Sequence, residues 1–386
     1  MADQIFVGDS IATGGATITV SDDGSGIDTL QIIGVYNEVT QFSLAWTTDL
    51  GVPTSASCRY STNDGVNFVS NRLIVEGVIE NAIGSNGSDF IQGNSIANLL
   101  YGDALDSGAG LNDTLWGGAG NDSIHGGAGN DGILGDNDDD RLFGNDGADT
   151  ISGGSGVDTV EGGTGADLLS GGANAGDTLS YASSAAAIQI GIEFGTTTTG
   201  SGGDAAGDQV TGFVDVIGSA FGDRIQDNTR GSLAFGYNDN LFYGGAGRDR
   251  LVLGGGNDHG FGGAGDDQLN GGLGRDTLTG GNGADLFVFK ASDSMVRQTQ
   301  RDRVSDFSSA QHDQIDLSNI DAEAHVTGNQ AFHLIMTKFQ GHVGELRLVA
   351  SGGDVVVMGD IDGDKLADFA ILVQGVTSLT DADFVL

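Results

Sequence analysis

The feature that most constrains this chain is a nine-residue repeat that runs from Gly117 to Ser170. Six blocks follow one another without a gap, beginning with GGAGNDSIH. Aspartate recurs at the sixth place of each block, and an aliphatic residue recurs at the eighth. A short period sustained in this way is typical of a solenoid, in which each repeat is one structural unit stacked on the next. The chain is therefore expected to form stacked short strands and turns rather than one thick core.

Each block divides into a turn and a strand. Glycine at the first, second and fourth places permits positive φ, so the first six residues are predicted to form a turn. The last three, such as residues 123–125, are predicted to form a strand whose middle side chain points inward. Two blocks complete one flattened coil, so alternate blocks stack on the same side. The predicted columns are Asp122, Asp140 and Asp158 on one side and Asp131, Asp149 and Asp167 on the other.

Columns of carboxylates on a glycine-rich backbone need a cation. Two carboxylates about 5 Å apart repel by roughly 3 kcal/mol at an effective dielectric constant of about 20. The turns offer carboxylate and backbone carbonyl oxygens, which suit Ca²⁺ with its about six to eight oxygen ligands. Zinc would need His or Cys at tetrahedral spacing, and the turns provide neither. We therefore predict multiple bound Ca²⁺ ions as the cofactor.

The blocks resemble the GGxGxDxUx nonapeptides of RTX (repeats-in-toxin) exported proteins. The resemblance implies an all-β fold, a parallel β-roll, whose successive turns hold Ca²⁺ between them through aspartate side chains and backbone carbonyls. The alternative is a metal-free glycine-rich solenoid, which would not explain why aspartate recurs at the same place of every block. The implied Ca²⁺ ligands are repeat aspartates and turn glycines: Asp89, Asp113, Gly117, Gly118, Gly120, Asp122, Gly126, Gly127, Gly129, Asp131, Asp140, Asp149, Asp158, Asp167, Asp177, Asp223, Gly244, Gly245, Gly247, Asp249, Asp258, Gly262, Gly263, Gly265, Asp267, Asp276 and Asp285.

Composition narrows the possible partners and location. The 386 residues include 54 Asp and Glu against 15 Lys and Arg, a formal net charge of -39, which argues against nucleic acid or an anionic membrane. No stretch approaches the roughly 20 apolar residues of a membrane helix, and the start does not resemble a Sec-type signal peptide. RTX proteins carry an uncleaved C-terminal signal, so the resemblance implies a type I ABC exporter as partner. The implied location is extracellular, free or associated with the cell surface.

Five regions are predicted along the chain. Residues 1–83 form either a β-rich cap or the first irregular coils. They are followed by a first β-roll at 84–180, a β-rich spacer at 181–217, a second β-roll at 218–289 and a C-terminal β module at 290–386. Two blocks depart from the pattern, because Gly260 stands at the inward apolar place and Asp138 replaces a turn glycine. Loose packing or weak metal binding is expected at both.

The C-terminal region resembles the last module of serralysin-type proteases, with the series RDRVSDFSSAQHDQIDLSNIDA and GDIDGDKLADFAILVQG. In that family the module caps the roll and carries the export signal, which Asp383-Phe-Val-Leu386 fits residue for residue. Within the module, the acidic residues Asp360, Asp362, Asp364 and Asp368 either bind one Ca²⁺ or form a Ca²⁺-free turn. In the spacer, Asp204 and Asp208 are either metal ligands or solvated loop acids.

No catalytic constellation is predicted, so we expect that the chain is not an enzyme. A serralysin would carry a zinc-binding H-E-x-x-H helix before the roll, and this sequence has none. IFVGDSIATGG looks like the nucleophile block of GDSL-type esterases with Ser10 in the serine place, and Asp122 with His125 imitates their distal pair. Asp122 and His125 lie inside a regular repeat, where Asp122 belongs to the turn.

The sequence thus predicts a secreted Ca²⁺-binding RTX protein whose rolls fold on extracellular Ca²⁺ after type I export, with a structural, surface or adhesive role. The alternative is a glycan-binding adhesin, or an accessory part of a secreted polysaccharide-active or hydrolytic enzyme. Its partner would be a cell-surface or extracellular polysaccharide. The candidate aromatic surface, whose residues otherwise pack between coils, consists of Tyr101, Trp116, His125, Phe143, Tyr243 and Phe261.

Overall fold

The structure is a computed structural model and describes residues 4–7, 29–32, 44–45, 55–56, 70–74, 81–84, 88–103, 110–172, 176–193, 195–228, 239–290, 293–294, 296, 300–322 and 330–386. Before residue 81 only the backbone of short strands is described. The chain divides into two compact units. Unit 1 comprises residues 1–180 and 204–213, and unit 2 comprises residues 181–203 and 214–386.

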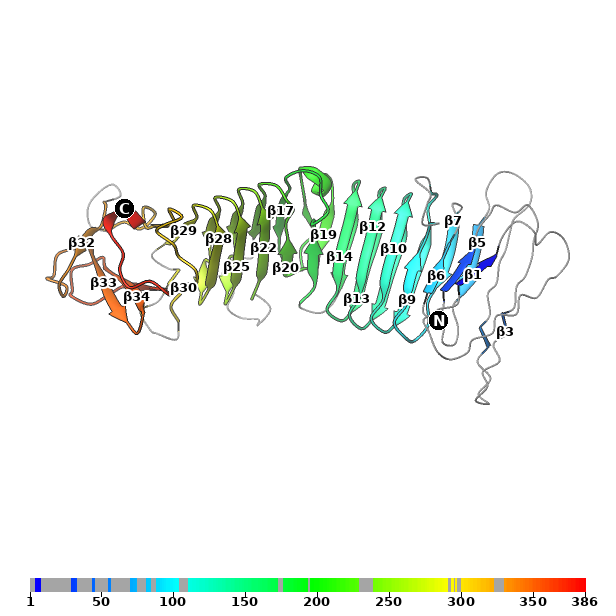
Figure 1. Cartoon of the computed structure of the whole chain (residues 1–386), viewed down its shortest axis with the longest axis horizontal. Coiled ribbons are helices and arrows are strands. Elements are labelled where there is room, and N and C mark those ends of the chain that lie inside the picture. Colours follow the sequence, from blue (N-terminus) through cyan, green and yellow to red (C-terminus); the bar gives the residue numbers. More distant parts are fainter. Residues whose placement is uncertain are drawn as a thin grey trace. The chain divides into compact units, whose positions relative to one another are not determined.

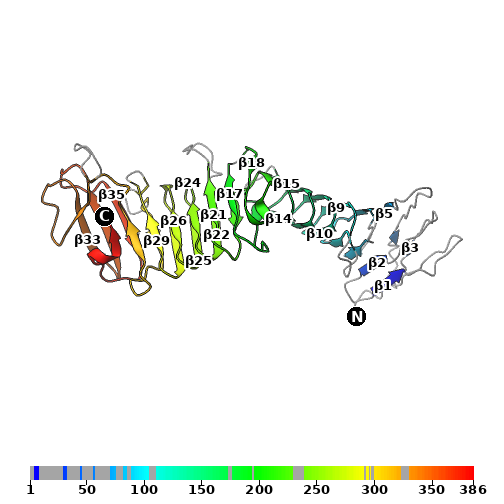
Figure 2. The same cartoon turned by 90° about the horizontal axis from the view of Figure 1, so that it is seen from above.

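Unit 1 is built from two rows of parallel strands (Figures 1 and 2). One row contains, in pairing order, β1 (Gln4–Val7), β2 (Thr29–Ile32), β6 (Asn81–Ile83), β8 (Leu99–Tyr101), β10 (Ser123–Ala128), β12 (Arg141–Asp146), β14 (Thr159–Thr164) and β16 (Thr178–Ser180). The other contains β5 (Ser70–Ile74), β7 (Ser88–Gln92), β9 (Thr114–Ala119), β11 (Gly132–Asn137), β13 (Thr150–Ser155), β15 (Leu168–Gly172) and β19 (Gln209–Thr211). A short antiparallel pair joins β3 (Leu44–Ala45) to β4 (Ser55–Ala56).

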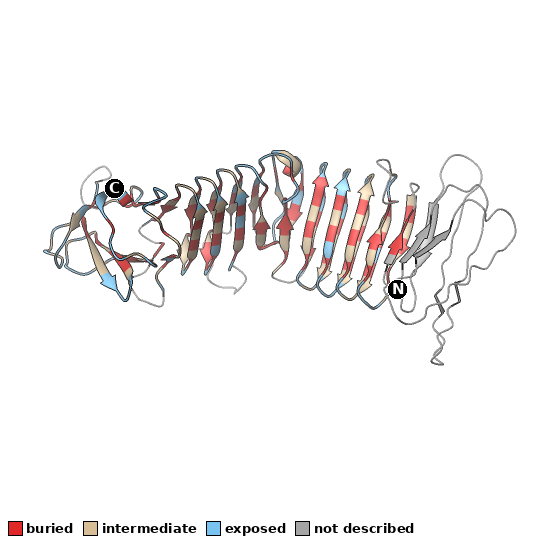
Figure 3. Cartoon of the chain, viewed as in Figure 1, coloured by how far each residue is buried: buried red, intermediate tan, exposed pale blue. Residues whose placement is uncertain are grey.

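The strand register confirms the predicted stacking of alternate blocks. β10 pairs with β12 so that Ile124 lies opposite Leu142, and β12 pairs with β14 so that Leu142 lies opposite Val160. These three side chains are fully buried. Their neighbours on either side along the strand are more exposed, so buried and exposed bands alternate in Figure 3. Each strand of the repeat thus contributes one inward side chain to a thin core, as a solenoid requires.

The strands are longer than the sequence predicts. β10 spans Ser123–Ala128, although only residues 123–125 were expected to be extended. Gly127 and Ala128 pair with Asn145 and Asp146 in the next coil. The prediction of a six-residue turn was therefore wrong, because the first residues of each turn extend the parallel ladder and satisfy their backbone groups there.

The three turn glycines also differ from one another. Gly118 and Gly120 have φ values of 111° and 99°, as predicted. Gly117 does not have positive φ. A Cβ atom at Gly117 would instead lie 2.2 Å from Asp122 Oδ2 and 2.8 Å from the carbonyl oxygen of Gly135. Glycine is therefore needed at the first place because two oxygen atoms approach the backbone there, rather than for its φ.

Unit 2 repeats the two-row arrangement. One row contains β20 (Asp215–Ile217), β22 (Leu241–Ala246), β25 (His259–Ala264), β28 (Thr277–Asn282), β30 (Arg303–Val304), β35 (Phe369–Val373), β34 (Asp354–Asp360), β33 (Glu345–Ser351) and β32 (His333–Ile335). The other contains β17 (Gln189–Ile192), β21 (Arg224–Asp227), β23 (Arg250–Val252), β26 (Gln268–Asn270), β29 (Leu286–Val288), β31 (Gln314–Asp316) and β36 (Phe384–Val385). The remaining short elements are β18 (Thr198–Thr199), β24 (Gly255–Gly256), β27 (Leu273–Gly274), η1 (Gly203–Ala205) and η2 (Asp381–Asp383).

The C-terminal region closes the roll of unit 2. β33, β34 and β35 form an antiparallel meander, and β35 then pairs in parallel with β30. The last strand, β36, pairs with β31 in the second row. Both rows therefore continue from the repeats into strands of the C-terminal region, which cover edges that would otherwise expose unpaired backbone groups. No helix in the described segments is long and apolar enough to span a membrane.

Two predicted regions merge with the rolls. In residues 1–83, β1, β2 and β6 continue the row of β8, and β5 continues that of β7, which favours first coils over a separate cap. The strands of the predicted spacer divide between the units. β19 pairs with β15 in unit 1, whereas β17 and β20 pair with β21 and β22 in unit 2.

The block that contains Gly260 is well packed, contrary to expectation. Its first place holds Leu253 instead of glycine, and Leu253 is fully buried. A Cβ atom at Gly260 would lie 3.1 Å from Leu253 Cδ1 and 3.4 Å from Leu278 Cδ2. The Leu253 side chain thus fills the space that the missing aliphatic residue leaves. The block therefore departs from the repeat twice, and the two departures compensate each other.

We predict that Leu253→Ala destabilises the chain by about 2–5 kcal/mol, because Gly260 provides no side chain to fill the cavity. Leu168→Ala is the control, since Leu168 is 46% exposed, and it should change the free energy of unfolding by about 0.5 kcal/mol or less. Both values can be measured by urea unfolding at saturating Ca²⁺. Equal losses for the two variants would contradict the compensation.

Candidate metal sites in the turns

The repeat aspartates form hydrogen-bonded columns. In unit 1 the backbone N–H of Asp122 donates to Asp140 Oδ1 at 2.8 Å, and that of Asp140 donates to Asp158 Oδ1 at 2.9 Å. The second column repeats the pattern from Asp131 to Asp149 at 2.7 Å. The stacking predicted for these aspartates is therefore confirmed.

Each unit contains two such columns. The columns of unit 1 are Asn98, Asp122, Asp140, Asp158 and Asp177, and Asp89, Asp113, Asp131, Asp149, Asp167 and Asp208. The columns of unit 2 are Asp223, Asp249, Asp267, Asp285 and Asp313, and Asn240, Asp258, Asp276 and Asp302.

The second carboxylate oxygen of most column members is buried without a hydrogen-bond donor. This orphan Oδ2 is found in Asp113, Asp122, Asp131, Asp140, Asp149, Asp158, Asp167, Asp249, Asp258, Asp267, Asp276, Asp285 and Asp302. Among the ion pairs of the described part of the chain, none involves these carboxylates. A buried charge of this kind is costly unless a cation or a hydrogen-bond donor compensates it.

Except in Asp258 and Asp302, each orphan oxygen faces the first glycine of its own turn. A Cβ atom built on Gly126 would lie 2.4 Å from Asp131 Oδ2 and 2.8 Å from the carbonyl oxygen of Gly144. At Gly262 the corresponding distances are 2.4 Å to Asp267 Oδ2 and 2.6 Å to the carbonyl oxygen of Gly280. A carboxylate oxygen and a carbonyl oxygen of the next coil thus approach the same point. A buried carboxylate oxygen without a donor, beside a backbone carbonyl oxygen, fits a hard cation such as Ca²⁺.

The other predicted turn glycines lie at the second and fourth places, where the backbone is left-handed. They are Gly118, Gly120, Gly127, Gly129, Gly245, Gly247, Gly263 and Gly265. At Gly263, for example, a Cβ atom would lie 2.0 Å from the carbonyl oxygen of Gly245 in the preceding coil. These glycines therefore let successive turns approach closely. Asp138 takes the fourth place of its block with φ of 73°, which Asp tolerates better than most residues.

Burial raises the pKa of the column carboxyl groups. Desolvation is the largest cause, and it raises the pKa of Asp140 and Asp149 to about 7 and that of Asp258 to about 9. Backbone hydrogen bonds lower these pKa values only in part. Neighbouring charges in the column raise them further, as Asp122 and Asp158 do for Asp140. Without a cation, the columns therefore hold protons near neutral pH.

Three predicted ligands, Asp89, Asp177 and Asp223, lie at or near the ends of their columns. Both carboxylate oxygens of Asp223 accept hydrogen bonds, Oδ2 from Ser219 N at 2.5 Å and Oδ1 from Ile188 N at 2.8 Å. Asp177 accepts from Asp158 N at 2.9 Å, and the N–H of Asp89 donates to Asp113. All three are buried in their columns, and both oxygens of Asp223 accept hydrogen bonds.

The columns also contain residues that the nine-residue period misses. Asp302 follows Asp276 by 26 residues instead of 18, yet Asp276 N donates to Asp302 Oδ1 at 2.9 Å. Burial raises the pKa of Asp302 to about 9. The segments Arg-Asp-Thr-Leu at 275–278 and Arg-Asp-Arg-Val at 301–304 are similar, and this similarity could have identified Asp302. Asp208 and Asp313 extend other columns after longer loops.

The acidic loop of the C-terminal region has a different geometry. Carboxylate oxygens of Asp360, Asp362 and Asp368 lie within 4.8 Å of one another, and Asp364 is not part of this group. Asp360 is fully buried and accepts hydrogen bonds from Gly363 N at 2.7 Å and Lys365 N at 3.0 Å. The loop thus brings three of the four predicted ligands together, and its own backbone holds Asp360 in place.

The esterase-like residues do not form a triad in the described structure. Ser10 lies outside the described residues. Asp122 belongs to a column, and its Oδ1 accepts from Asn98 N at 2.7 Å. The His125 ring is stacked between Tyr101 and Phe143, with ring centroids 4.7 and 4.6 Å apart, and burial lowers its pKa. Asp122 and His125 are thus both held by contacts of the roll.

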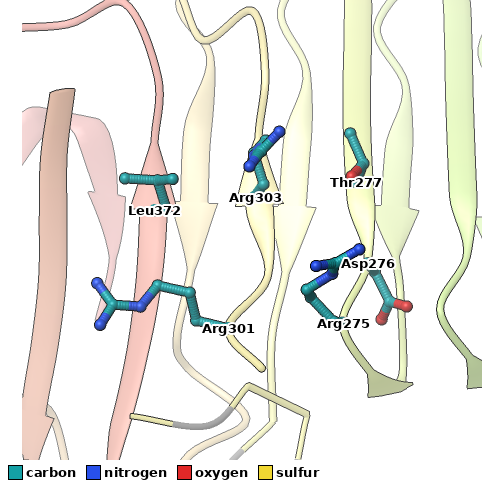
Figure 4. Close-up of a pocket in the computed structure, with 6 residues that line it drawn as sticks. All are labelled: Arg275, Asp276, Thr277, Arg301, Arg303 and Leu372. Atoms are coloured by element: carbon teal, nitrogen blue, oxygen red, sulfur yellow. The ribbon is translucent and has the colours of Figure 1, made fainter. Parts of the chain in front are cut away.

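A pocket of about 90 Å³ in unit 2 is lined by Arg275, Asp276, Thr277, Arg301, Arg303 and Leu372 (Figure 4). The guanidinium groups of Arg275 and Arg301 point away from each other in this view. The one hydroxyl of the lining, Thr277, has no histidine beside it among these residues. The lining therefore lacks the hydroxyl and histidine pair of serine-type acyl transfer.

A family model of known proteins matches the repeats. The RTX calcium-binding nonapeptide repeat family matches residues 82–104, 107–142, 134–169, 143–176, 236–260 and 261–290. The solved structures similar to the chain include two subunits of the Azotobacter vinelandii mannuronan C5-epimerase. The AlgE6R3 subunit is 28% identical, with a TM-score of 0.30, and the match covers 40% of this chain and 82% of that one. The AlgE6R2 subunit is 23% identical, with a TM-score of 0.25, and the match covers 44% and 91%.

A comparison with curated proteins gives no match. The assignment therefore depends on the repeats themselves, whose strands stack in parallel and whose aspartates form columns with unpaired oxygens. The matched segments cover most of the two predicted rolls. The chain thus contains RTX calcium-binding nonapeptide repeats, and its described repeats fold as a parallel β-roll.

Proposed function

We propose that this chain is a secreted Ca²⁺-binding protein whose rolls fold when they reach extracellular Ca²⁺ after type I export, and that its role is structural or adhesive rather than catalytic. The observation that carries the proposal is the series of buried Oδ2 atoms without a donor in both units. A roll in this state needs cations, and extracellular Ca²⁺ supplies them. The columns therefore couple folding to the compartment in which Ca²⁺ is abundant.

The free energy of Ca²⁺ binding is large enough to stabilise the folded rolls. Extracellular Ca²⁺ modules typically bind with Kd of about 10⁻⁴ to 10⁻³ M. A free Ca²⁺ concentration of about ten times Kd contributes about 1.4 kcal/mol per site, and about ten sites would together match the roughly 5–15 kcal/mol stability of an ordinary domain. At sub-micromolar cytosolic Ca²⁺ this contribution vanishes, while carboxylate repulsion remains. The chain would then stay unfolded and competent for export inside the cell.

The C-terminus supports an export signal that is read before folding. Asp383 and Phe384 are both buried, and Thr380 donates hydrogen bonds to Asp383 Oδ2. Phe384 lies opposite Ile315 in the sheet of unit 2. The first two residues of a signal formed by Asp383-Phe-Val-Leu386 would be inaccessible in the folded module, so an exporter would have to engage them in the unfolded chain.

The glycan-binding alternative receives little support from the aromatic residues. His125 has its ring between those of Tyr101 and Phe143, and Tyr243 stacks on Phe261 with ring centroids 4.8 Å apart. A sugar packs against the face of an aromatic ring, and neighbouring rings cover both faces of His125 and one face each of Tyr101, Phe143, Tyr243 and Phe261. The stacked rings therefore act as packing between coils.

We predict that Ca²⁺-free rolls gain stability on acidification. The repeat carboxyls have pKa values of about 6 to 9 in the folded state against an ordinary value of 3.8. Folded rolls therefore bind more protons, and their stability is fully present below about pH 4 and is lost as the pH rises through about 7. Circular dichroism in EGTA at pH 5 and pH 8 should show more β-structure at pH 5. More β-structure at pH 8 would contradict this assignment of the columns.

We further predict that removal of residues 383–386 prevents export by a type I exporter in a bacterial host, because the signal is lost. Asp149→Asn is the control, since it alters a column but leaves the C-terminus intact, and it should be exported like the wild type. Secretion can be followed by immunoblot of medium and cells. Export of the truncated chain at the wild-type level would contradict the proposed signal.

A further inference from the structure

A second pocket of unit 2, of about 240 Å³, lies over the neighbouring strands β23, β26 and β29 (Figure 2). Its described lining contains two cationic side chains, Arg250 and Lys290, and no acidic one. Nine of the 15 Lys and Arg of the chain lie between residues 224 and 303, so positive charge is concentrated in this part of the sequence. In a chain with a net charge of -39, a cationic lining without a carboxylate is suited to an anionic ligand.

Arg250 is held in a fixed orientation. Its side chain is half-buried, and its Nε donates to Gln268 Oε1 at 2.8 Å. Gln268 lies directly opposite Arg250 in the parallel pair of β23 and β26. None of the ion pairs in the described segments involves Arg250 or Lys290. Because the bond to Gln268 uses only Nε, the terminal guanidinium N–H groups are left to match the two oxygens of a carboxylate.

The rest of the lining combines fixed amide groups with apolar surface. Asn270 is only 6% exposed, and its Nδ2 donates to the carbonyl oxygen of Val288 at 2.6 Å and to Asp293 Oδ2 at 3.1 Å. Val252 lies opposite Asn270, and both Val252 and Val288 line the pocket. Asp293 Oδ2 also accepts from Lys290 N at 2.8 Å, so two donors partly compensate the charge of this neighbouring acid.

We propose that this pocket binds a sugar that carries one carboxylate. Arg250 binds the carboxylate, Lys290 adds positive charge, and the amides of Asn270 and Asn319 bind hydroxyl groups, while Val252 contacts the C–H surface of the ring. The volume lies below the about 300–1,000 Å³ of sites for drug-sized ligands, which fits a single sugar ring. The negative charge of the rest of the chain disfavours a densely charged polymer. The inference rests on the adhesive role in the proposed function and names the chemistry of its partner.

Uronic acids and sialic acids both have a pyranose ring with one carboxylate, so both are used as probes. Methyl glucuronide and methyl sialoside are titrated into the full-length chain at saturating Ca²⁺, and binding is measured by saturation-transfer NMR. Methyl glucoside tests the need for the charge, and acetate tests the need for the ring. Circular dichroism with Ca²⁺ and with EGTA is recorded on the same samples to follow folding.

Three variants test the assignment: Arg250→Gln, Lys290→Gln and Arg224→Gln. Arg224 is the matched control, because it lies opposite Arg250 on the adjacent strand β21, is exposed and does not line the pocket. We expect saturable binding of at least one acidic sugar, and none of methyl glucoside or acetate at the same concentrations. Arg250→Gln should weaken this binding by about tenfold, since it removes a charge-assisted pair of hydrogen bonds, and Arg224→Gln should retain it.

Absence of binding by both acidic sugars would overturn the inference, and so would acetate binding of equal strength or equal losses in Arg250→Gln and Arg224→Gln. If Arg250→Gln does not fold at saturating Ca²⁺, Lys290→Gln decides, because Lys290 is exposed, and wild-type affinity in that variant would overturn the site. Any of these results with normal Ca²⁺-dependent folding leaves the coupling of folding to Ca²⁺ intact. A wild-type chain that folds equally in EGTA would instead overturn the proposed function.

Discussion

The structure depends on how buried carboxylates in stacked turns are neutralised. The stacking of coils that buries Ile124 and Leu142 also brings the N–H of Asp122 to the carboxylate of Asp140. The apolar core and the aspartate column therefore form together. In most repeat aspartates, Oδ1 accepts a hydrogen bond from a backbone N–H of the preceding coil, and Oδ2 remains without a donor. The backbone ladder thus brings charges together that the chain itself does not neutralise. Stability then becomes a function of the cation concentration outside the protein.

Glycine enables this arrangement in two distinct ways. At the second and fourth places it adopts positive φ, so that the chain reverses direction between the two rows. At the first place it leaves space in which a carboxylate oxygen and a carbonyl oxygen meet. In one block Leu253 replaces the glycine of the first place, and its side chain fills the core space that Gly260 leaves empty. The repeat therefore tolerates a substitution when the space is filled from the same block.

Much of the fold could be predicted from the sequence because the period acts in every coil. The inward aliphatic residues, the parallel stacking and the aspartate columns follow from it and are confirmed by the register of β10, β12 and β14. The length of the strands could not be predicted, because glycine is a weak strand former and joins the ladder only when the neighbouring coil provides partners. Residues 1–83 lack the period, and the structure describes only the backbone of short strands before residue 81.

The site was predictable only where its spacing is regular. Asp302 and Asp313 join their columns after insertions, so counting by nine does not reach them. Asp223 has the expected place, but both of its oxygens are paired, with Ser219 and with Ile188. The insertions and these hydrogen-bond partners lie outside the nine-residue pattern.

The central claim, that Ca²⁺ binding and folding of the rolls are one process, is tested most directly by far-UV circular dichroism of the full chain. Protein freed of metal with EGTA is titrated with Ca²⁺, and Mg²⁺ serves as the control, because its smaller ion and strict octahedral geometry fit these turns poorly. The account predicts a cooperative gain of β-structure with Ca²⁺ and none with Mg²⁺. A spectrum that is the same with and without Ca²⁺ would contradict it, since the orphan carboxylates would then be tolerated without a cation.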